Sequence, residues 1–319
     1  MERARNHART VDVVGAHFGD DALRLVRVRT TADGRSRTVA VAAVDLPDGL
    51  VEHGVVRAAG VLPPAVARVA KRFAAGTPVR VALATSDCAV VALGARKSDP
   101  LALLAAHAAS SGPTADVIWA DVVSIAHRSV GLAGARRSSV QRTAAALRRA
   151  DLVVTAVEAG PICLVAAAMS LGGPSDATWT VELGGADVHV CATVSRGGRV
   201  EGGATPRSGG ATAFTLTTRP GARGPTDLLD PLCERLGRGA TRGPSEAVPL
   251  FALAYGATLA GRWSAVDSPD LAQAVVVRPL GAIDPDLPRW AVEPITDRSC
   301  GDRGVRSRRV GRLAARAPS

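Results

Sequence analysis

Runs of strand-forming residues recur in the same order in two separate parts of the chain. The first part begins with residues 11–18, 22–30 and 36–44, which are joined by short polar turns. The pattern returns in residues 177–183 and 187–194, followed by a weaker third run. Identity between the two parts is not evident. It is therefore the repeated order of elements that predicts two related halves.

After the three runs of the first part, the apolar spacing changes to that of helices. In residues 62–74, Leu62, Val66, Val69 and Phe73 fall on one helical face. The remaining elements expected in this part are strands over 79–84 and 152–157, a helix over 138–150 and a buried helix over 161–171. This order of strands and helices is typical of an α/β fold.

Breaks in these patterns predict the domain boundaries. Residues 85–135 are interrupted by glycine and proline, and we interpret them as an inserted subdomain. We expect a first half over 11–84 plus 136–173 and a second, shortened half over 174–295. Residues 296–319 are expected to form a disordered basic tail.

The composition weakens any functional interpretation of the overall charge. The net charge is +10, but lysine occurs only at Lys71 and Lys97 and the other basic residues are arginine. Together with the high alanine and glycine content, this is typical of a GC-rich genome such as that of an actinobacterium. Aromatic residues make up only 3% of the chain, so the cores must be built from alanine, valine and leucine.

The tail accounts for a large part of the charge. Residues 296–319 hold seven arginines and two aspartates, which gives +5, half of the total excess. The tail has no apolar periodicity and no interleaved aromatic residues. It therefore fits a solvated tail better than a segment that binds nucleic acid. Contact with phospholipid headgroups is the other reading.

Cysteine usage and hydropathy indicate a cytoplasmic protein. The five cysteines form no CxxC pair, so neither a metal ribbon nor a disulfide framework is supported. The first ten residues are polar and lack the apolar segment of a secretory signal. The most apolar run, residues 159–171, is too short to cross a bilayer.

Four stretches in a fixed order resemble the PilM family of type IV pilus assembly proteins, relatives of the division protein FtsA in the actin-like ATPase superfamily. They are residues 14–26 (VGAHFGDDALRLV), 46–56 (LPDGLVEHGVV), 146–154 (ALRRADLVV) and 181–190 (VELGGADVHV), the last followed by a Gly-Gly pair. The resemblance extends over most of residues 11–261. It implies an actin-like (ribonuclease H-like) fold of two halves.

The resemblance also implies where a nucleotide would bind. In this superfamily two glycine hairpins, one in each half, cradle the phosphates with backbone N–H groups, and an acidic residue at each hairpin holds magnesium through water. A third loop and a closing helix complete the site. Carried over to this chain, the implied nucleotide-binding residues are Gly19, Glu182, Gly184, Gly185, Gly209, Gly210, Gly221 and Gly256.

Several residues depart from the family pattern at these positions. The acid of the first hairpin is replaced by His17, and Asp20 and Asp21 stand where small hydroxyl residues are usual. Two carboxylates facing a triphosphate would repel it. In the second hairpin the expected hydroxyl is replaced by Val188, and in the adenosine loop Gly221 lacks its glycine partner.

The wall of the nucleotide cleft departs further from the family. Relatives carry an extra subdomain between the positions of Gly210 and Phe214, and this chain has almost nothing there. We therefore expect an actin-like fold with one cleft-wall subdomain missing. Without that wall the base and ribose of a nucleotide would stay exposed to water, which weakens binding. No cofactor is expected, and at best weak ATP and magnesium binding.

Other chemistry-bearing residues have simpler readings. His17 is interpreted as a strand-end histidine, and Asp20 and Asp21 as turn residues, although they could share a cation. His189 and Cys191 alternate on one strand face but have no third metal ligand nearby. Glu158 either faces the cleft or caps the helix that follows. No catalytic residue and no metal ligand is assigned.

The sequence leads to one preferred function and two alternatives. The preferred one is a cytoplasmic scaffold that docks a cytoplasmic segment of an inner-membrane assembly protein through residues 85–135. It contacts the membrane only through that partner or the arginine-rich tail. The alternatives are an active actin-like ATPase and a chaperone-like or secretion-associated actin-fold protein with no link to pili.

The tail provides the first prediction. Because it has no apolar period with which to pack on the body, deleting residues 300–319 should leave the melting temperature nearly unchanged in differential scanning calorimetry. A drop of many degrees would show that the tail packs on the folded body.

Overall fold

The first half is built on a five-stranded mixed sheet. The computed structural model describes residues 10–31, 35–52, 54–57, 61–94, 117–123, 130–172, 179–184, 189–195, 199–203, 212–217, 226–237, 245–259, 275–280 and 289–294. The strands are β1 (Val11–Phe18), β2 (Ala22–Thr30), β3 (Ser36–Asp45), β6 (Val79–Ala82) and β10 (Val154–Glu158). Their order in the sheet is β10-β6-β1-β2-β3. The first three strands pair antiparallel, whereas β6 and β10 continue the sheet in parallel with β1.

Two helices cover the outer face of this sheet. These are α1 (Pro64–Ala74) and α3 (Arg137–Arg149), which precede β6 and β10 respectively. Val14, Ala16 and Phe18 of β1 share an apolar cluster with Val66 of α1 and Leu147 of α3. The small hairpin β4 (Val51–Glu52) and β5 (Val55–Val56) lies between β3 and α1 in the chain. The strands and helices expected from periodicity in this half are therefore present, with shifts of a few residues at their ends.

The second half repeats the strand order of the first. Strands β11 (Trp179–Gly184), β12 (His189–Ser195) and β13 (Arg199–Gly203) pair antiparallel. Strand β14 (Thr212–Thr217) is parallel to β11, and β15 (Thr226–Asp227) is parallel to β14. Their order, β15-β14-β11-β12-β13, matches β10-β6-β1-β2-β3 element by element. Two halves with this shared order define the actin-like, ribonuclease H-like fold that the sequence predicts.

The second sheet continues beyond β13 with strands from other parts of the chain. Strands β7 (Cys88–Gly94), β9 (Val130–Arg136) and β8 (Val117–Val123) follow β13, and the hairpin of β16 (Val275–Leu280) and β17 (Arg289–Pro294) comes last. Three strands thus lie in residues 85–135, which we interpreted as less regular. β7 pairs directly with β13. The domain boundaries given above stay a prediction, and residues 296–319 lie outside the described residues.

Little chain separates β13 from β14. β13 ends at Gly203 and β14 begins at Thr212, so only residues 204–211 lie between them. This is the place where the sequence predicts the missing cleft wall, and a subdomain cannot be built from so short a connection.

Two elements of the second half differ from the expected helices. The apolar spacing of Leu228, Leu229, Leu232 and Leu236 predicts a helix from Thr226. The helix begins later, as α5 (Leu229–Leu236), because Thr226 and Asp227 pair as β15. The closing helix predicted over 246–261 is divided into a 3₁₀ segment, Ser245–Leu250, and α6 (Phe251–Leu259). Pro249 lies in the 3₁₀ segment, and because proline lacks an N–H it cannot take part in a regular helix there.

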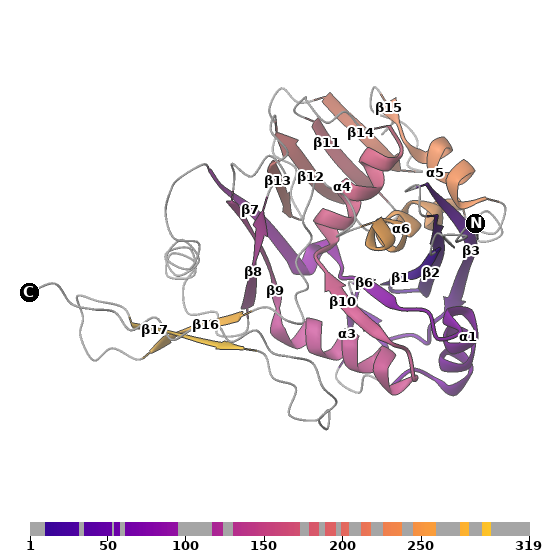
Figure 1. Ribbon diagram of the computed structural model, residues 1–319, viewed down its shortest axis with the longest axis horizontal. Helices are drawn as coiled ribbons and strands as arrows, with labels where there is room; N and C mark the ends of the chain where they lie inside the picture. The colour runs from indigo at the N-terminus through magenta and orange to yellow at the C-terminus, as the bar shows by residue number, and fades with distance from the viewer. Residues whose placement is uncertain are drawn as a thin grey trace, which may run out of the picture.

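Two helices lie back to back between the sheets of the two halves (Figure 1). Helix α6 packs on β1, β2 and β6, whereas α4 (Gly160–Ser170) packs on β7, β11, β12 and β13. Every residue of α6 is buried, and α4 is buried from Gly160 to Ala168. The buried helix predicted over residues 161–171 is therefore present as α4, which is apolar around its whole circumference because it has protein on all sides.

Glycines bring these backbones into contact. A Cβ at Gly256 of α6 would lie 1.8 Å from the carbonyl oxygen of Cys163 on α4. A Cβ at Gly15 of β1 would lie 1.8 Å from the carbonyl oxygen of Ala254 on α6. Neither obstacle is a side chain that could rotate away, so any larger residue must push the backbones apart.

This contact gives a stability prediction. Gly256→Ala should lower the free energy of unfolding by about 3 kcal/mol or more, because the new methyl group overlaps a backbone carbonyl in a packed core. Gly49→Ala is the matched control, since Gly49 has φ +75° but open space around it, and its cost should be only about 1 kcal/mol of backbone strain. Urea unfolding measures both values. Equal losses for the two variants would contradict the packing role of Gly256.

Candidate functional site

The carboxyl-terminal ends of β1, β6 and β10 meet at one edge of the first sheet. His17 of β1 lies opposite Ala82 of β6, and Ala82 lies opposite Glu158 of β10. In open α/β sheets, ligands bind outside the carboxyl ends of the parallel strands. The first glycine hairpin, residues 19–21, follows β1 at this edge. We call this the carboxyl edge of the first sheet.

His17 is a buried, neutral imidazole. Its side chain is 3% exposed, and its Nδ1 lies 3.2 Å from the carbonyl oxygen of Ala82, to which it can only donate. Burial, together with the charge of Arg24, lowers the pKa of His17 from 6.5 to about 4. The residue in the acid position of the hairpin therefore carries no charge at neutral pH. It cannot supply the negative charge that holds a magnesium hydration shell.

Arg24 fills the inner side of the first hairpin. It lies on β2 opposite His17 and is only 1% exposed. Its Nη2 donates to both carboxylate oxygens of Asp21, at 2.9 and 2.7 Å. Its guanidinium carbon lies 5.9 Å from the ring centre of Phe251 on α6, within range of a cation–π interaction. The guanidinium therefore connects the hairpin to the helix that passes between the two halves.

The glycine and the two carboxylates of the hairpin all have internal contacts. A Cβ at Gly19 would lie 2.1 Å from Nη1 of Arg24, so a larger residue here would have to displace the end of the Arg24 side chain. The backbone N–H of Gly54 donates to Oδ1 of Asp20 at 2.6 Å, while Asp21 pairs with Arg24. Asp20 therefore joins the first hairpin to the β4–β5 turn. Turn and packing chemistry accounts for all three residues.

Glu158 forms a buried ion pair at the same edge. It is fully buried, and Nε of Arg80 on β6 donates to its Oε1 at 2.9 Å, with a second contact from Nη2 of Arg80. Glu158 directly precedes Ala159, the N-cap residue of α4, and Ala159 makes no side-chain cap hydrogen bond. Arg80 holds the carboxylate inside the protein, which compensates part of the cost of its burial.

The second hairpin is described only in part. On β11, Glu182 lies opposite Cys191 of β12 and Gly184 lies opposite His189. Gly185, Val188, Gly209, Gly210 and Gly221 lie outside the described residues. Within the described ranges, no three His, Cys, Asp or Glu residues are grouped so that they could hold a metal ion. Gly256 lies on α6 against Cys163, where close packing accounts for the glycine without a ligand.

Sequence reasoning singled out His17, Asp20, Asp21 and Glu158 but missed the two arginines that hold them. Arg24 stands in a strand with other arginines and there resembles a solvent-facing residue. The spacing of three residues between Asp21 and Arg24 could have predicted that the two side chains form an ion pair beside His17. At the carboxyl edge the cations Arg24 and Arg80 point into the protein, where they pair with the exposed carboxylate of Asp21 and the buried carboxylate of Glu158.

Comparisons with known proteins add three partial likenesses. The sequence matches no family model and no curated protein. A structure of the PilM–PilN type IV pilus biogenesis complex matches with 21% identity and a TM-score of 0.48, over 60% of this chain and 61% of that one. The cytoplasmic domain of EpsL, an inner-membrane component of the type II secretion system of Vibrio cholerae, matches with 11% identity and a TM-score of 0.44. It covers 71% of this chain and 94% of that one.

The third likeness is to a protein from Bacteroides thetaiotaomicron with an actin-like ATPase fold and unknown function. Identity is 8% and the TM-score 0.38, over 76% of this chain and 95% of that one. All three TM-scores are below 0.5, so the assignment of the fold rests on the repeated strand order. This chain spans about 61% of the length of the PilM–PilN chain that it matches. None of the described helices is long and apolar enough to span a membrane.

The neutral state of His17 predicts a pH dependence. Between pH 6.5 and about 4 the unfolded chain binds a proton at His17 that the native protein does not. The free energy of unfolding should therefore fall as the pH is lowered through this window, by roughly 3 kcal/mol in total. His17→Gln keeps a donor for the carbonyl of Ala82 but does not titrate, so its loss over the same window should be smaller by that amount. Urea unfolding at a series of pH values checks this, and identical profiles would show that His17 is not buried neutral.

Proposed function

We propose that this protein is a cytoplasmic actin-fold scaffold whose nucleotide site no longer hydrolyses ATP. The observation that carries the proposal is the position of Arg24. Its guanidinium occupies the first hairpin, where relatives bind phosphates, and is paired there with Asp21. A triphosphate would have to displace this guanidinium, which is almost fully buried, from its exposed partner Asp21, and leaving a buried charge without its partner is costly.

The loss of the acid position supports the same conclusion. Phosphoryl transfer depends on positioning magnesium and on stabilising developing charge. A neutral imidazole at His17 does neither, and Glu158 is already paired with Arg80. The short connection between β13 and β14 leaves no wall for the base and ribose. The site residues implied in the second half, Glu182, Gly184 and Gly185 among them, stay candidates for weak binding only.

For the partner, we propose a cytoplasmic segment of an inner-membrane assembly protein, docked near residues 85–135. This rests on the sequence stretches that resemble the PilM family. Of the structures with partial likeness, one is a type IV pilus biogenesis complex and the other is the cytoplasmic domain of an inner-membrane component of a secretion system. A survey of the neighbouring genes tests it: a gene for a pilus-type membrane protein should lie nearby. Its absence would favour the chaperone-like or secretion-associated alternative.

Hydrolysis provides the sharper test. The purified protein should release no phosphate from ATP with magnesium, and its melting temperature should rise little or not at all, because only a ligand of the native state stabilises it. His17→Asp alone should not restore turnover, since Arg24 still fills the hairpin. His17→Asp/Arg24→Ser removes both obstacles of the first half, and a gain of ATP-induced stabilisation in this variant would support the assignment of the hairpin.

One result would contradict the proposal directly. Turnover by the wild-type protein that disappears in Glu182→Ala would mean that the second hairpin still organises a metal. The active-ATPase alternative would then hold.

A further inference from the structure

The two outer helices of the first half end at the same edge of the sheet. α1 leads into β6 and α3 leads into β10, so both helices end where these parallel strands begin. This amino-terminal edge is opposite the carboxyl edge that holds His17 and Glu158. Lys71 of α1 joins the two helix ends directly, since its Nζ donates to Oδ2 of Asp151 at 2.7 Å. Figure 1 shows the ends of α1 and α3 side by side at the lower right.

Both last turns are basic. That of α1 carries Lys71 and Arg72, and that of α3 carries Arg148 and Arg149. All four side chains are exposed. Basic residues are favourable at the negative end of a helix dipole, which explains why each last turn contains them. The dipole does not explain why the two last turns lie on one surface. The only carboxylate named in this contact is that of Asp151, itself exposed.

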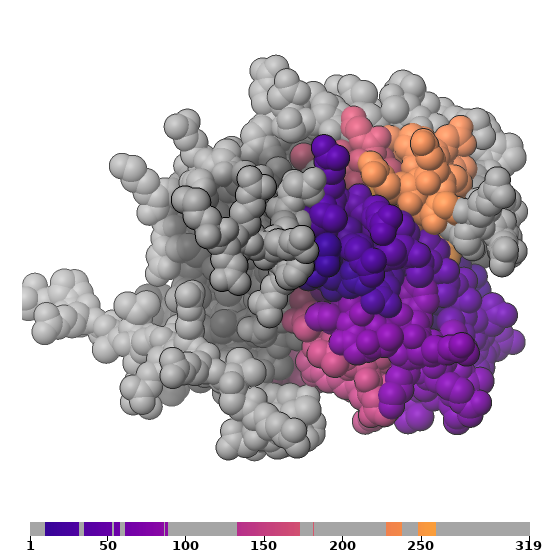
Figure 2. Space-filling view, turned by 45° about the vertical axis from the view of Figure 1, so that its right-hand side comes forward, coloured from indigo at the N-terminus to yellow at the C-terminus, as the bar shows by residue number. Residues whose placement is uncertain are grey.

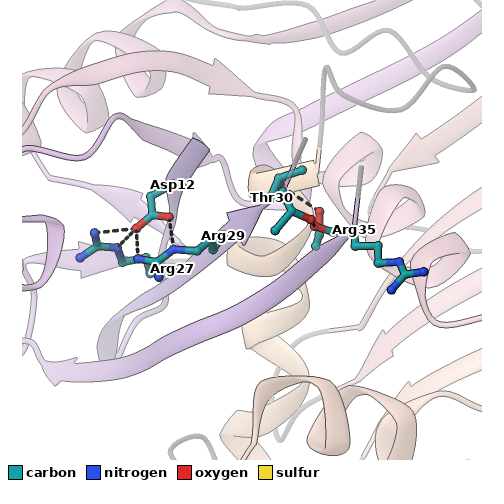
Figure 3. A network of polar contacts seen from close by, with 7 residues as sticks. Asp12, Arg27, Arg29, Thr30 and Arg35 are labelled. Carbon is teal, nitrogen blue, oxygen red and sulfur yellow. Dashed lines mark hydrogen bonds and ion pairs between the residues drawn. The ribbon is translucent and has the colours of Figure 1, made fainter. Parts of the chain in front are cut away.

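The start of β1 and the end of β2 add further positive charge at this edge. β1 begins here because it is parallel to β6, with Val14 opposite Val79. Figure 3 shows Arg27 and Arg29 converging on one carboxylate, that of Asp12. Arg27 Nη2 donates to it at 2.7 Å and Arg29 Nε at 2.8 Å. These bonds, that of Arg29 above all, lower the pKa of Asp12 to about 2, so it remains charged but neutralises only one of the two arginines.

We call the surface formed by Asp12, Arg27, Arg29 and the last turns of α1 and α3 the basic edge. The residues named here are six cations and, with Asp151, two carboxylates, so the named cations outnumber the named carboxylates by four. The carboxyl edge has the opposite balance. There Arg24 and Arg80 face Asp20, Asp21 and Glu158, which gives −1. The positive charge of this half is therefore concentrated on one side.

Exposed valines accompany these cations. Val11 at the start of β1 is 47% exposed, Val69 on α1 45% and Val153 beside Asp151 54%. Single exposed apolar residues are ordinary, but here three large ones occur among the basic residues of one edge. In Figure 2 the surface of the segment that contains α1 adjoins that of the segment that contains α3 at the lower edge of the molecule.

We propose that the basic edge binds a membrane surface through its anionic phospholipid headgroups. Each basic residue near an anionic bilayer strengthens binding by about fivefold, and aliphatic side chains reach into the headgroup boundary. The exposed apolar side chains of the edge are valines. Nucleic-acid surfaces use aromatic side chains for stacking, so these residues suit lipid better. The site is independent of the nucleotide hairpins, because it lies at the opposite edge of the sheet.

Vesicle sedimentation of the full chain tests this. The protein should sediment with phosphatidylcholine vesicles that contain phosphatidylglycerol, and not with phosphatidylcholine alone. Arg72→Gln/Arg149→Gln removes one cation from each helix and should weaken binding about tenfold or more. Arg57→Gln/Arg235→Gln is the matched control, because it removes the same net charge from exposed arginines elsewhere and should bind like the wild type. Melting temperatures of both variants show that the fold is kept.

The alternatives give distinct results. Equal binding to neutral vesicles, no binding at all, or equal weakening by both double variants would each overturn the proposal. Loss of binding on deletion of residues 300–319, with the basic-edge variant unaffected, would assign the membrane contact to the tail instead. If the basic-edge variant reduced binding to a single-stranded DNA of matched charge while vesicle binding stayed the same, the edge would be a nucleic-acid site. ATP turnover does not enter these readouts, so failure here is distinguishable from failure of the proposed function.

Discussion

The close approach of α6 to its two neighbours constrains the rest of this structure. Its backbone lies directly against β1 at Gly15 and against α4 at Gly256, so no side chain separates these elements. Because α6 packs on the first sheet and α4 on the second, the distance between the halves is set by glycine contacts. That contact also fixes Phe251, the first residue of α6, where its ring can meet the guanidinium of Arg24. The guanidinium that fills the first hairpin thus also contacts the helix that packs between the halves.

In the first hairpin, the guanidinium of Arg24 lies where the family pattern places the phosphates of a nucleotide. In an actin-like ATPase the phosphate hairpin is left open by its glycine and closes on a ligand. Here the space beside Gly19 is occupied by the protein's own guanidinium, that of Arg24. The carboxylate of Asp21 and the ring of Phe251 both contact that cation. Glycine in a family motif is therefore no proof of ligand binding, since the same freedom of backbone approach serves an internal side chain.

Periodicity predicted the elements of the fold better than it predicted the site. The strand runs 11–18 and 22–30 and the all-apolar helix α4 follow from local spacing, which is a property of neighbouring residues. The pair of Arg80 and Glu158 is separated by 78 residues and depends on two parallel strands meeting in register. The hairpin could be examined because its residues are close in sequence, yet Arg24 was hidden among the other arginines of β2.

The topology of the first sheet places exposed basic residues mainly at one of its two edges. In a βαβ arrangement every crossover helix returns to the edge where the next parallel strand begins, so the last turns of such helices converge. Each can take cations at its own dipole, and α1 and α3 both do. At the carboxyl edge, by contrast, the arginines point into the protein and are matched by carboxylates. The GC-rich genome that the composition predicts would account for many arginines. It would not account for the difference between an edge where arginines point into the protein and an edge where cations outnumber the named carboxylates beside exposed valines, whereas a membrane-facing edge would.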